Sequence, residues 1–145
     1  MTPHAPKSAT SGRGRTPSAT VLVVDDEEEV LFALAAVIEE QGWRVLTAHN
    51  GREALEILKA ARPDLMLVDL FMPVMGGIEL LRAIKSDERL ARIPRLVMTA
   101  ANDRMIGVKE DVSVLYKPID LETLVLTLRR HLEPPATSQR PPVLG

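Results

Sequence analysis

Residues 65–77 read LMLVDLFMPVMGG, and this stretch is the best guide to how the chain folds. Four apolar residues end on a single acid, Asp69, and the turn that follows contains a proline and then Gly76 and Gly77. A short, uninterrupted apolar run bounded by turn residues is typical of a strand that is buried on both faces. The stretch therefore predicts a parallel strand that delivers one acidic side chain to the edge of a sheet.

The same alternation continues on both sides of this stretch. Apolar runs predict strands at residues 21–24, 43–48, 65–68, 95–98 and 112–116. Apolar stripes with helical spacing predict helices at residues 28–41, 51–61 and 78–85, and a last helix after the N-capping residue Asp120. Strands that alternate with helices indicate successive βαβ units, so we expect an α/β fold with one parallel sheet.

The two ends of the chain differ in composition from its centre. Residues 1–19 are rich in Ser, Thr, Pro and Gly and carry three cations but no acid, so we expect a disordered basic arm there. Residues 133–145 are rich in proline and predict a disordered or extended tail. Residues 20–132 then form one folded domain.

Composition excludes several classes of protein. The formal net charge is −2 and the cations of the arm leave the folded part acidic, so we expect no binding to DNA. The chain has no cysteine, which excludes disulfides and thiolate metal sites and is compatible with a reducing compartment. No apolar run reaches the roughly 18 residues that a membrane span needs. We therefore expect a cytoplasmic protein with no membrane insertion.

Polar residues follow four of the five predicted strands: Asp25 and Asp26, Asp69, Thr99 and Lys117. Because the carboxyl ends of parallel strands share one edge of a sheet, we expect these side chains to meet. Three adjacent carboxylates repel one another and need positive charge, which Lys117 and a divalent cation such as Mg²⁺ can supply. Such a site suits phosphoryl transfer, with Asp69 as nucleophile, Lys117 as partner of the phosphoryl oxygens and Thr99 as hydroxyl donor.

Four motifs, VLVVDDEE (21–28), LVDLFMPVMGG (67–77), VMTA (97–100) and YKP (116–118), resemble those of response regulator receiver domains of two-component signalling, including the chemotaxis regulators. The resemblance covers nearly all of residues 20–132. It implies a flavodoxin-like, doubly wound sheet of five strands in the order 2-1-3-4-5. It also implies a cis peptide bond before Pro118, which would direct Lys117 at the site.

The resemblance further implies a function and a metal site. Asp69 would take a phosphoryl group from a sensor histidine kinase or a histidine phosphotransfer protein, and the domain would catalyse both this transfer and the later hydrolysis. Mg²⁺ would be held by Asp26, Asp69 and the backbone carbonyl of Phe71, with Asp25 acting largely through water. The downstream partner would be a protein that the sequence does not identify.

The sequence departs from the family pattern in two places. Val114 stands where the family usually has an aromatic residue that moves when the domain is phosphorylated, and Tyr116, two residues on, is expected to share its face of the strand and to substitute in part. The interval from Thr99 to Lys117 is about one helical turn shorter than usual, so we expect a short or irregular fourth helix between residues 102 and 111.

Two functions remain open from the sequence. The first is a stand-alone phosphoacceptor that signals through protein contacts, and the alternative is a receiver-like interaction module that is not phosphorylated. A lone Asp69 could be a turn residue, and a lone Lys117 a solvated surface lysine. Those readings leave unexplained why four strands end on polar residues together. His4, His49 and His131 form no motif, and we assign them no chemistry.

Overall fold

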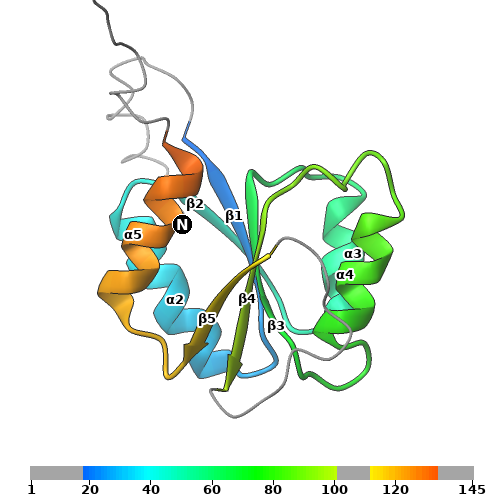
Figure 1. Cartoon of the computed structure of the whole chain (residues 1–145), viewed down its shortest axis with the longest axis horizontal. Coiled ribbons are helices and arrows are strands. Elements are labelled where there is room, and N and C mark those ends of the chain that lie inside the picture. The colour runs from blue at the N-terminus through cyan, green and yellow to red at the C-terminus, as the bar shows by residue number, and fades with distance from the viewer. Residues whose placement is uncertain (1–17, 101–111, 134–145) are drawn as a thin grey trace, which may run out of the picture.

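A computed structural model describes residues 18–100 and 112–133, which form a five-stranded parallel sheet between two layers of helices (Figure 1). The strands are β1 (Thr20–Val24), β2 (Arg44–Ala48), β3 (Leu65–Asp69), β4 (Arg95–Ala100) and β5 (Ser113–Lys117). The described helices are α2 (Glu28–Glu40), α3 (Gly51–Leu58), α4 (Gly77–Lys85) and α5 (Leu121–Leu132). The expected arm and tail and the expected short fourth helix lie essentially outside the described residues.

The strand order is β2-β1-β3-β4-β5, and every neighbouring pair is parallel. This is the flavodoxin-like order that the resemblance implies. The chain leaves β1 toward one edge of the sheet to form β2 and then returns to the other side of β1 to form β3. Ligand sites of such sheets lie outside the carboxyl ends of the strands where the order reverses, here at β1 and β3.

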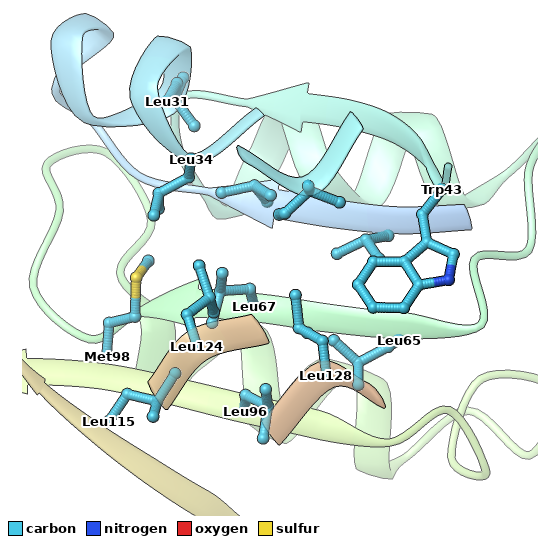
Figure 2. Close-up of a cluster of buried hydrophobic side chains, with 13 residues drawn as sticks. Leu31, Leu34, Trp43, Leu65, Leu67, Leu96, Met98, Leu115, Leu124 and Leu128 are labelled. Atoms are coloured by element: carbon cyan, nitrogen blue, oxygen red, sulfur yellow. The ribbon is translucent and has the colours of Figure 1, made fainter. Parts of the chain in front are cut away.

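Side chains that alternate along the strands build a core on each face of the sheet. In β1, Val21 and Val23 pack on the side of α2 and α5, whereas Leu22 and Val24 pack on the side of α3 and α4. Figure 1 shows this pairing of helices, and Figure 2 shows Leu124 and Leu128 of α5 directed at the strands. Burial on both faces explains why the strands read as continuous apolar runs.

Local capping explains where the helices begin. The side chain of Asn50 accepts a hydrogen bond from the N–H of Glu53 at 2.9 Å and so caps α3. The carboxylate of Asp120 accepts from both the N–H and the hydroxyl of Thr123, at 2.9 and 2.7 Å, which confirms Asp120 as the expected N-cap of α5. Among the described residues, no helix is long and apolar enough to cross a membrane.

Several boundaries shift by one to three residues from those expected, and the structure explains two of the shifts. Helix α3 ends at Leu58 instead of continuing to Ala61, because Leu58 is its last buried apolar residue and the N–H of Lys59 already bonds three residues back, to Glu56. The second strand begins at Arg44 instead of Trp43. The Trp43 ring lies in the core on the side of α2, just before the ladder with β1 starts (Figure 2).

Candidate functional site

Three carboxylates from two neighbouring strands lie together at the carboxyl edge of the sheet. Asp25 and Asp26 follow β1 and Asp69 ends β3, and one oxygen from each side chain lies within 4.8 Å of the other two. Asp25 is fully buried and Asp69 is 6% exposed, whereas Asp26 is exposed. The backbone holds Asp25 in place, because its N–H donates to the carbonyl of Ala48 in β2 at 3.1 Å. The structure thus brings together the carboxylates that the sequence selects.

Lys117 ends β5 and reaches across the sheet to this group of acids. Its Nζ atom lies 3.2 Å from Oδ2 of Asp25 and 3.2 Å from Oδ1 of Asp69. The Lys117–Pro118 peptide bond is cis, as the resemblance implies. Asp25 is therefore engaged directly: one of its oxygens meets Lys117, and the other accepts the N–H of Glu27 at 2.9 Å.

The surroundings of Asp69 disfavour its charged form. Burial and the negative charge of Asp25 raise the pKa of the Asp69 carboxyl group from 3.8 to about 6, although Lys117 opposes the shift. For Lys117, burial acts to lower the pKa, but the carboxylates of Asp69 and Asp25 outweigh it and raise the pKa above 10.5. Near neutral pH the site therefore holds a charged lysine among acids whose charge it only partly balances.

The donor set fits a hard divalent cation. Mg²⁺ prefers oxygen ligands at about 2.1 Å, so opposite ligands of one ion are about 4 Å apart. The three carboxylate oxygens already lie within 4.8 Å of one another, close to that spacing. A cation would also lower the repulsion that raises the pKa of Asp69. Asp25, Asp26 and Asp69 could thus hold Mg²⁺ after small side-chain movements.

Thr99 lies at the same edge of the sheet. In the register of β3, β4 and β5, Asp69 is opposite Met98, and Thr99 is opposite Tyr116. Thr99 therefore lies one position closer to the carboxyl edge of the sheet than the residue opposite Asp69. Thr99 is 1% exposed. This location agrees with the expected hydroxyl donor, whose role in the chemistry stays a prediction.

The turn between β3 and α4 is held close to the end of β3. The N–H of Gly77 donates to the carbonyl of Leu70 at 2.9 Å, and a Cβ atom on Gly77 would lie 2.7 Å from the Cα atom of Leu70. Only glycine permits this approach. The Phe71 side chain is 56% exposed. The ligand to Mg²⁺ that we expect from this residue is its backbone carbonyl.

The tip of this turn is strained. The N–H of Met75 donates to the carbonyl of Pro73 at 2.8 Å, and Val74 between them has a φ of 71°. A bond across three residues with a positive central φ is a γ-turn of the strained kind. A β-branched residue rarely adopts this conformation, and Val74 is 73% exposed, so no core packing of its own side chain compensates.

Comparison with known proteins identifies the family. The sequence model of the response regulator receiver domain family matches residues 21–129 of the chain. The chain is a member of this family. The receiver domain is 32% identical over 114 residues to the protein PilH of Pseudomonas aeruginosa, a match that covers 76% of this chain and 94% of PilH. It spans only 25% to 53% of the length of several longer regulatory proteins that it also matches.

Solved structures support the same assignment. The receiver domain matches the chemotaxis response regulator CheY4 of Vibrio cholerae with a TM-score of 0.74 and 34% identity, over 79% of this chain and 99% of that one. It matches the receiver domain of the sensor histidine kinase PA1611 from Pseudomonas aeruginosa with a TM-score of 0.74 and 26% identity, over 81% and 99% of the two chains. That structure has a magnesium ion coordinated in its active site cleft.

Two residues of β5 bear on the expected departure from the family pattern. Val114 is partly buried and Tyr116 is 52% exposed, and the buried Leu115 between them packs into the core on the side of α2 and α5. Val114 and Tyr116 therefore share the opposite face of the strand, as expected. The partial replacement of the missing aromatic by Tyr116 stays a prediction.

The sequence did not point to one polar cluster at this edge. Between Glu28 and Glu53 lies His49, whose Nε2 is 2.7 Å from Oε1 of Glu28 and whose Nδ1 is 2.9 Å from Oε1 of Glu53. The sequence offered one hint of this cluster, the spacing of four residues between His49 and Glu53. The same spacing brings two side chains together on one face of a helix. The contact with Glu28, 21 residues away, comes from the fold alone.

Proposed function

We propose that Asp69 of this receiver domain accepts a phosphoryl group in a Mg²⁺-dependent reaction. The observation that carries the proposal is the meeting of Asp25, Asp26 and Asp69 with Lys117 at the point where the strand order reverses. The donor would be a phosphohistidine of a sensor histidine kinase or of a phosphotransfer protein. Membership of the family supports this chemistry, and the magnesium-bound PA1611 structure supports the metal.

The reaction needs the ionised form of Asp69. One of its carboxylate oxygens forms the bond to phosphorus while the bond from phosphorus to the donor nitrogen breaks, and the donor keeps that electron pair and gains a proton. The charge on the transferred oxygens then faces the ammonium of Lys117, which already lies 3.2 Å from Asp69. The hydroxyl of Thr99, at the end of β4, would donate to another of these oxygens.

Mg²⁺ held by Asp26, Asp69 and the carbonyl of Phe71 would screen the transferred oxygens and keep Asp69 ionised. The protein's own contribution is to place the acids. Both oxygens of Asp25 are engaged, by Lys117 and by the N–H of Glu27, so we expect Asp25 to act on the ion largely through water. Asp26, which is exposed, is the freer ligand.

Intact-protein mass spectrometry after incubation with acetyl phosphate and Mg²⁺ tests the proposal. We expect one phosphoryl adduct on the wild type, and none on Asp69→Asn or after chelation of the metal. Glu88→Gln, which alters an exposed acid between α4 and the amino end of β4, should label like the wild type. Absence of an adduct on folded wild type, both with acetyl phosphate and with several phosphorylated histidine phosphotransfer proteins, would refute it.

We further propose that the phosphorylated domain acts in the cytoplasm and signals by binding another protein. The match to nearly all of PilH supports a stand-alone regulator of this kind. Val114 favours a second candidate, an interaction module that does not switch, because the usual aromatic is missing. A Tyr116 side chain that keeps one environment in nuclear magnetic resonance spectra with and without a phosphoryl mimic would support that alternative.

A further inference from the structure

His49 faces a carboxylate on each side of its ring. Its Nε2 atom lies 2.7 Å from Oε1 of Glu28, and its Nδ1 atom lies 2.9 Å from Oε1 of Glu53. The backbone N–H of His49 donates to the same Glu53 oxygen at 2.7 Å. Three separate parts of the chain therefore meet here: the first turn of α2, the end of β2 and the first turn of α3.

The chemistry of these contacts selects one protonation state. An ionised carboxylate only accepts hydrogen bonds, and a neutral imidazole has one N–H and one bare nitrogen. Neutral His49 would thus turn a lone pair toward one of the two glutamates. Only the imidazolium form donates to Glu28 and Glu53 together. In agreement, hydrogen bonds to Glu53 and then to Glu28 raise the pKa of His49 above 6.5.

The cluster adjoins the phosphoacceptor edge without belonging to it. Glu28 begins α2, two residues after Asp26. On the other side, Ala48, the neighbour of His49, accepts the N–H of Asp25 at 3.1 Å. The turn that carries both aspartates is therefore joined to the end of β2 at two points. Asp25 bonds to Ala48, and Glu28 bonds to His49.

We propose that protonated His49 is a pH-sensitive clamp that joins the first turns of α2 and α3 and opens as the pH rises. A histidine that is more basic in the fold than in the unfolded chain stabilises the fold fully below pH 6.5, and this contribution is lost as the pH rises through the folded value. The clamp would thus make the order of the acidic edge depend on pH.

Other charges near the clamp do not reverse this dependence. The segments that meet at His49 carry these charged groups: Asp25 and Asp26 after β1, Glu27, Glu28 and Glu29 at the start of α2, and Arg52, Glu53 and Glu56 in α3. Seven of these eight are acids, and two of them, Glu53 and Glu28, raise the pKa of His49. Arg52 is the one cation among them.

Nuclear magnetic resonance titration of the two described histidines tests the clamp directly. We expect His49 to titrate above pH 6.5 in the wild type, lower in Glu53→Gln and in Glu28→Gln, and close to 6.5 when both glutamates are replaced. The resonance that disappears in His49→Gln is assigned to His49, and His131→Gln should leave the titration of that resonance unchanged. Titration of His49 at or below 6.5 in the wild type, or no response to either glutamine, would overturn the proposal.

Urea unfolding tests the consequence for the fold. We expect His49→Gln to raise the unfolding equilibrium constant by about two- to fivefold at pH 6, and to change it little at pH 9, since each exposed ion pair is weak. His131→Gln should show no such dependence. An increase in the unfolding equilibrium constant for His49→Gln that is equal at pH 6 and pH 9 would refute the clamp.

If that variant does not fold, the Glu28→Gln, Glu53→Gln double variant gives the same comparison. Neither assay uses a phosphoryl group, so the outcome is independent of the function proposed for Asp69.

Discussion

Replacement of Asp69 by asparagine should stabilise the metal-free domain at neutral pH, even though it removes the proposed nucleophile. Asp69 is nearly buried beside Asp25, and its negative charge is unfavourable there until a cation arrives. Asparagine has almost the same shape and removes that charge, while its carbonyl oxygen can still accept from Lys117. The site would thus hold a charge that its function requires and its stability opposes.

The size and sign of the effect follow from the two pKa values. Burial and Asp25 raise the pKa of Asp69 from 3.8 to about 6. Between these two pH values, Asp69 therefore keeps its proton in the folded state but loses it in the unfolded chain. Stability of the metal-free protein therefore falls as the pH rises through this window. At about 1.36 kcal/mol for each unit, ionised Asp69 costs the fold about 3 kcal/mol at pH 7, and under about 1 kcal/mol at pH 4.

Urea unfolding with a chelator present, at pH 4 and at pH 7, measures this difference. We expect Asp69→Asn to be more stable than the wild type by about 1 to 3 kcal/mol at pH 7 and by less than about 1 kcal/mol at pH 4. Excess Mg²⁺ should stabilise the wild type more than the variant, because the variant lacks one ligand charge. A variant that is less stable than the wild type at pH 7, or a gain that is the same at both pH values, would refute the argument. Glu88→Gln is the control.

Three further substitutions test how the site is held. Lys117→Met removes the partner of two buried acids and should destabilise the metal-free domain by about 3 kcal/mol at pH 7 and less at pH 5, where Asp69 takes up a proton; urea unfolding at both values measures this. Val74→Gly should raise the melting temperature by the equivalent of about 1 kcal/mol, because it relieves the positive φ of the γ-turn, and a lower melting temperature would contradict that strain. Gly77→Ala should cost about 1 to 3 kcal/mol, since its Cβ would collide with the carbonyl oxygen of Asp69 and lie 2.7 Å from Cα of Leu70. Gly76→Ala, whose nearest contact would be the carbonyl oxygen of Leu70 at 3.3 Å, should cost clearly less in the same urea assay.

The sheet and the acidic site could be predicted because both depend on short stretches of sequence. A strand buried on both faces must be apolar at every position, so β1, β3 and β4 are visible as runs that stop at a polar residue. Once the strands are parallel, all of their carboxyl ends share one edge, and Asp25, Asp69 and Lys117 must converge there. Strand boundaries were less certain, and Trp43 shows why: its ring is buried although its backbone lies outside the ladder.

Contacts that join distant segments could not be predicted in the same way. The sequence shows that Asp25 and Lys117 lie at one edge, but not that Asp25 is fully buried against the ammonium, because that depends on the depth at which β1 sits between β2 and β3. Likewise, a γ-turn at Val74 contradicts local preference, since valine rarely adopts a positive φ. It persists because both sides of the turn are fixed, by the bonds of Gly77 to Leu70 and of Met75 to Gly51.

The cluster around His49 shows how such a distant contact acquires a chemical meaning. Glu28 and Glu53 each lie in the first turn of a helix, where an acid complements the helix dipole. The parallel order of β1 and β2 places the first turns of the two following helices on either side of the end of β2. Two acids that each stabilise their own helix then repel each other unless a cation lies between them. His49 can supply that charge only in its protonated form, so the dependence on pH arises from the packing of the two helices and not from any motif.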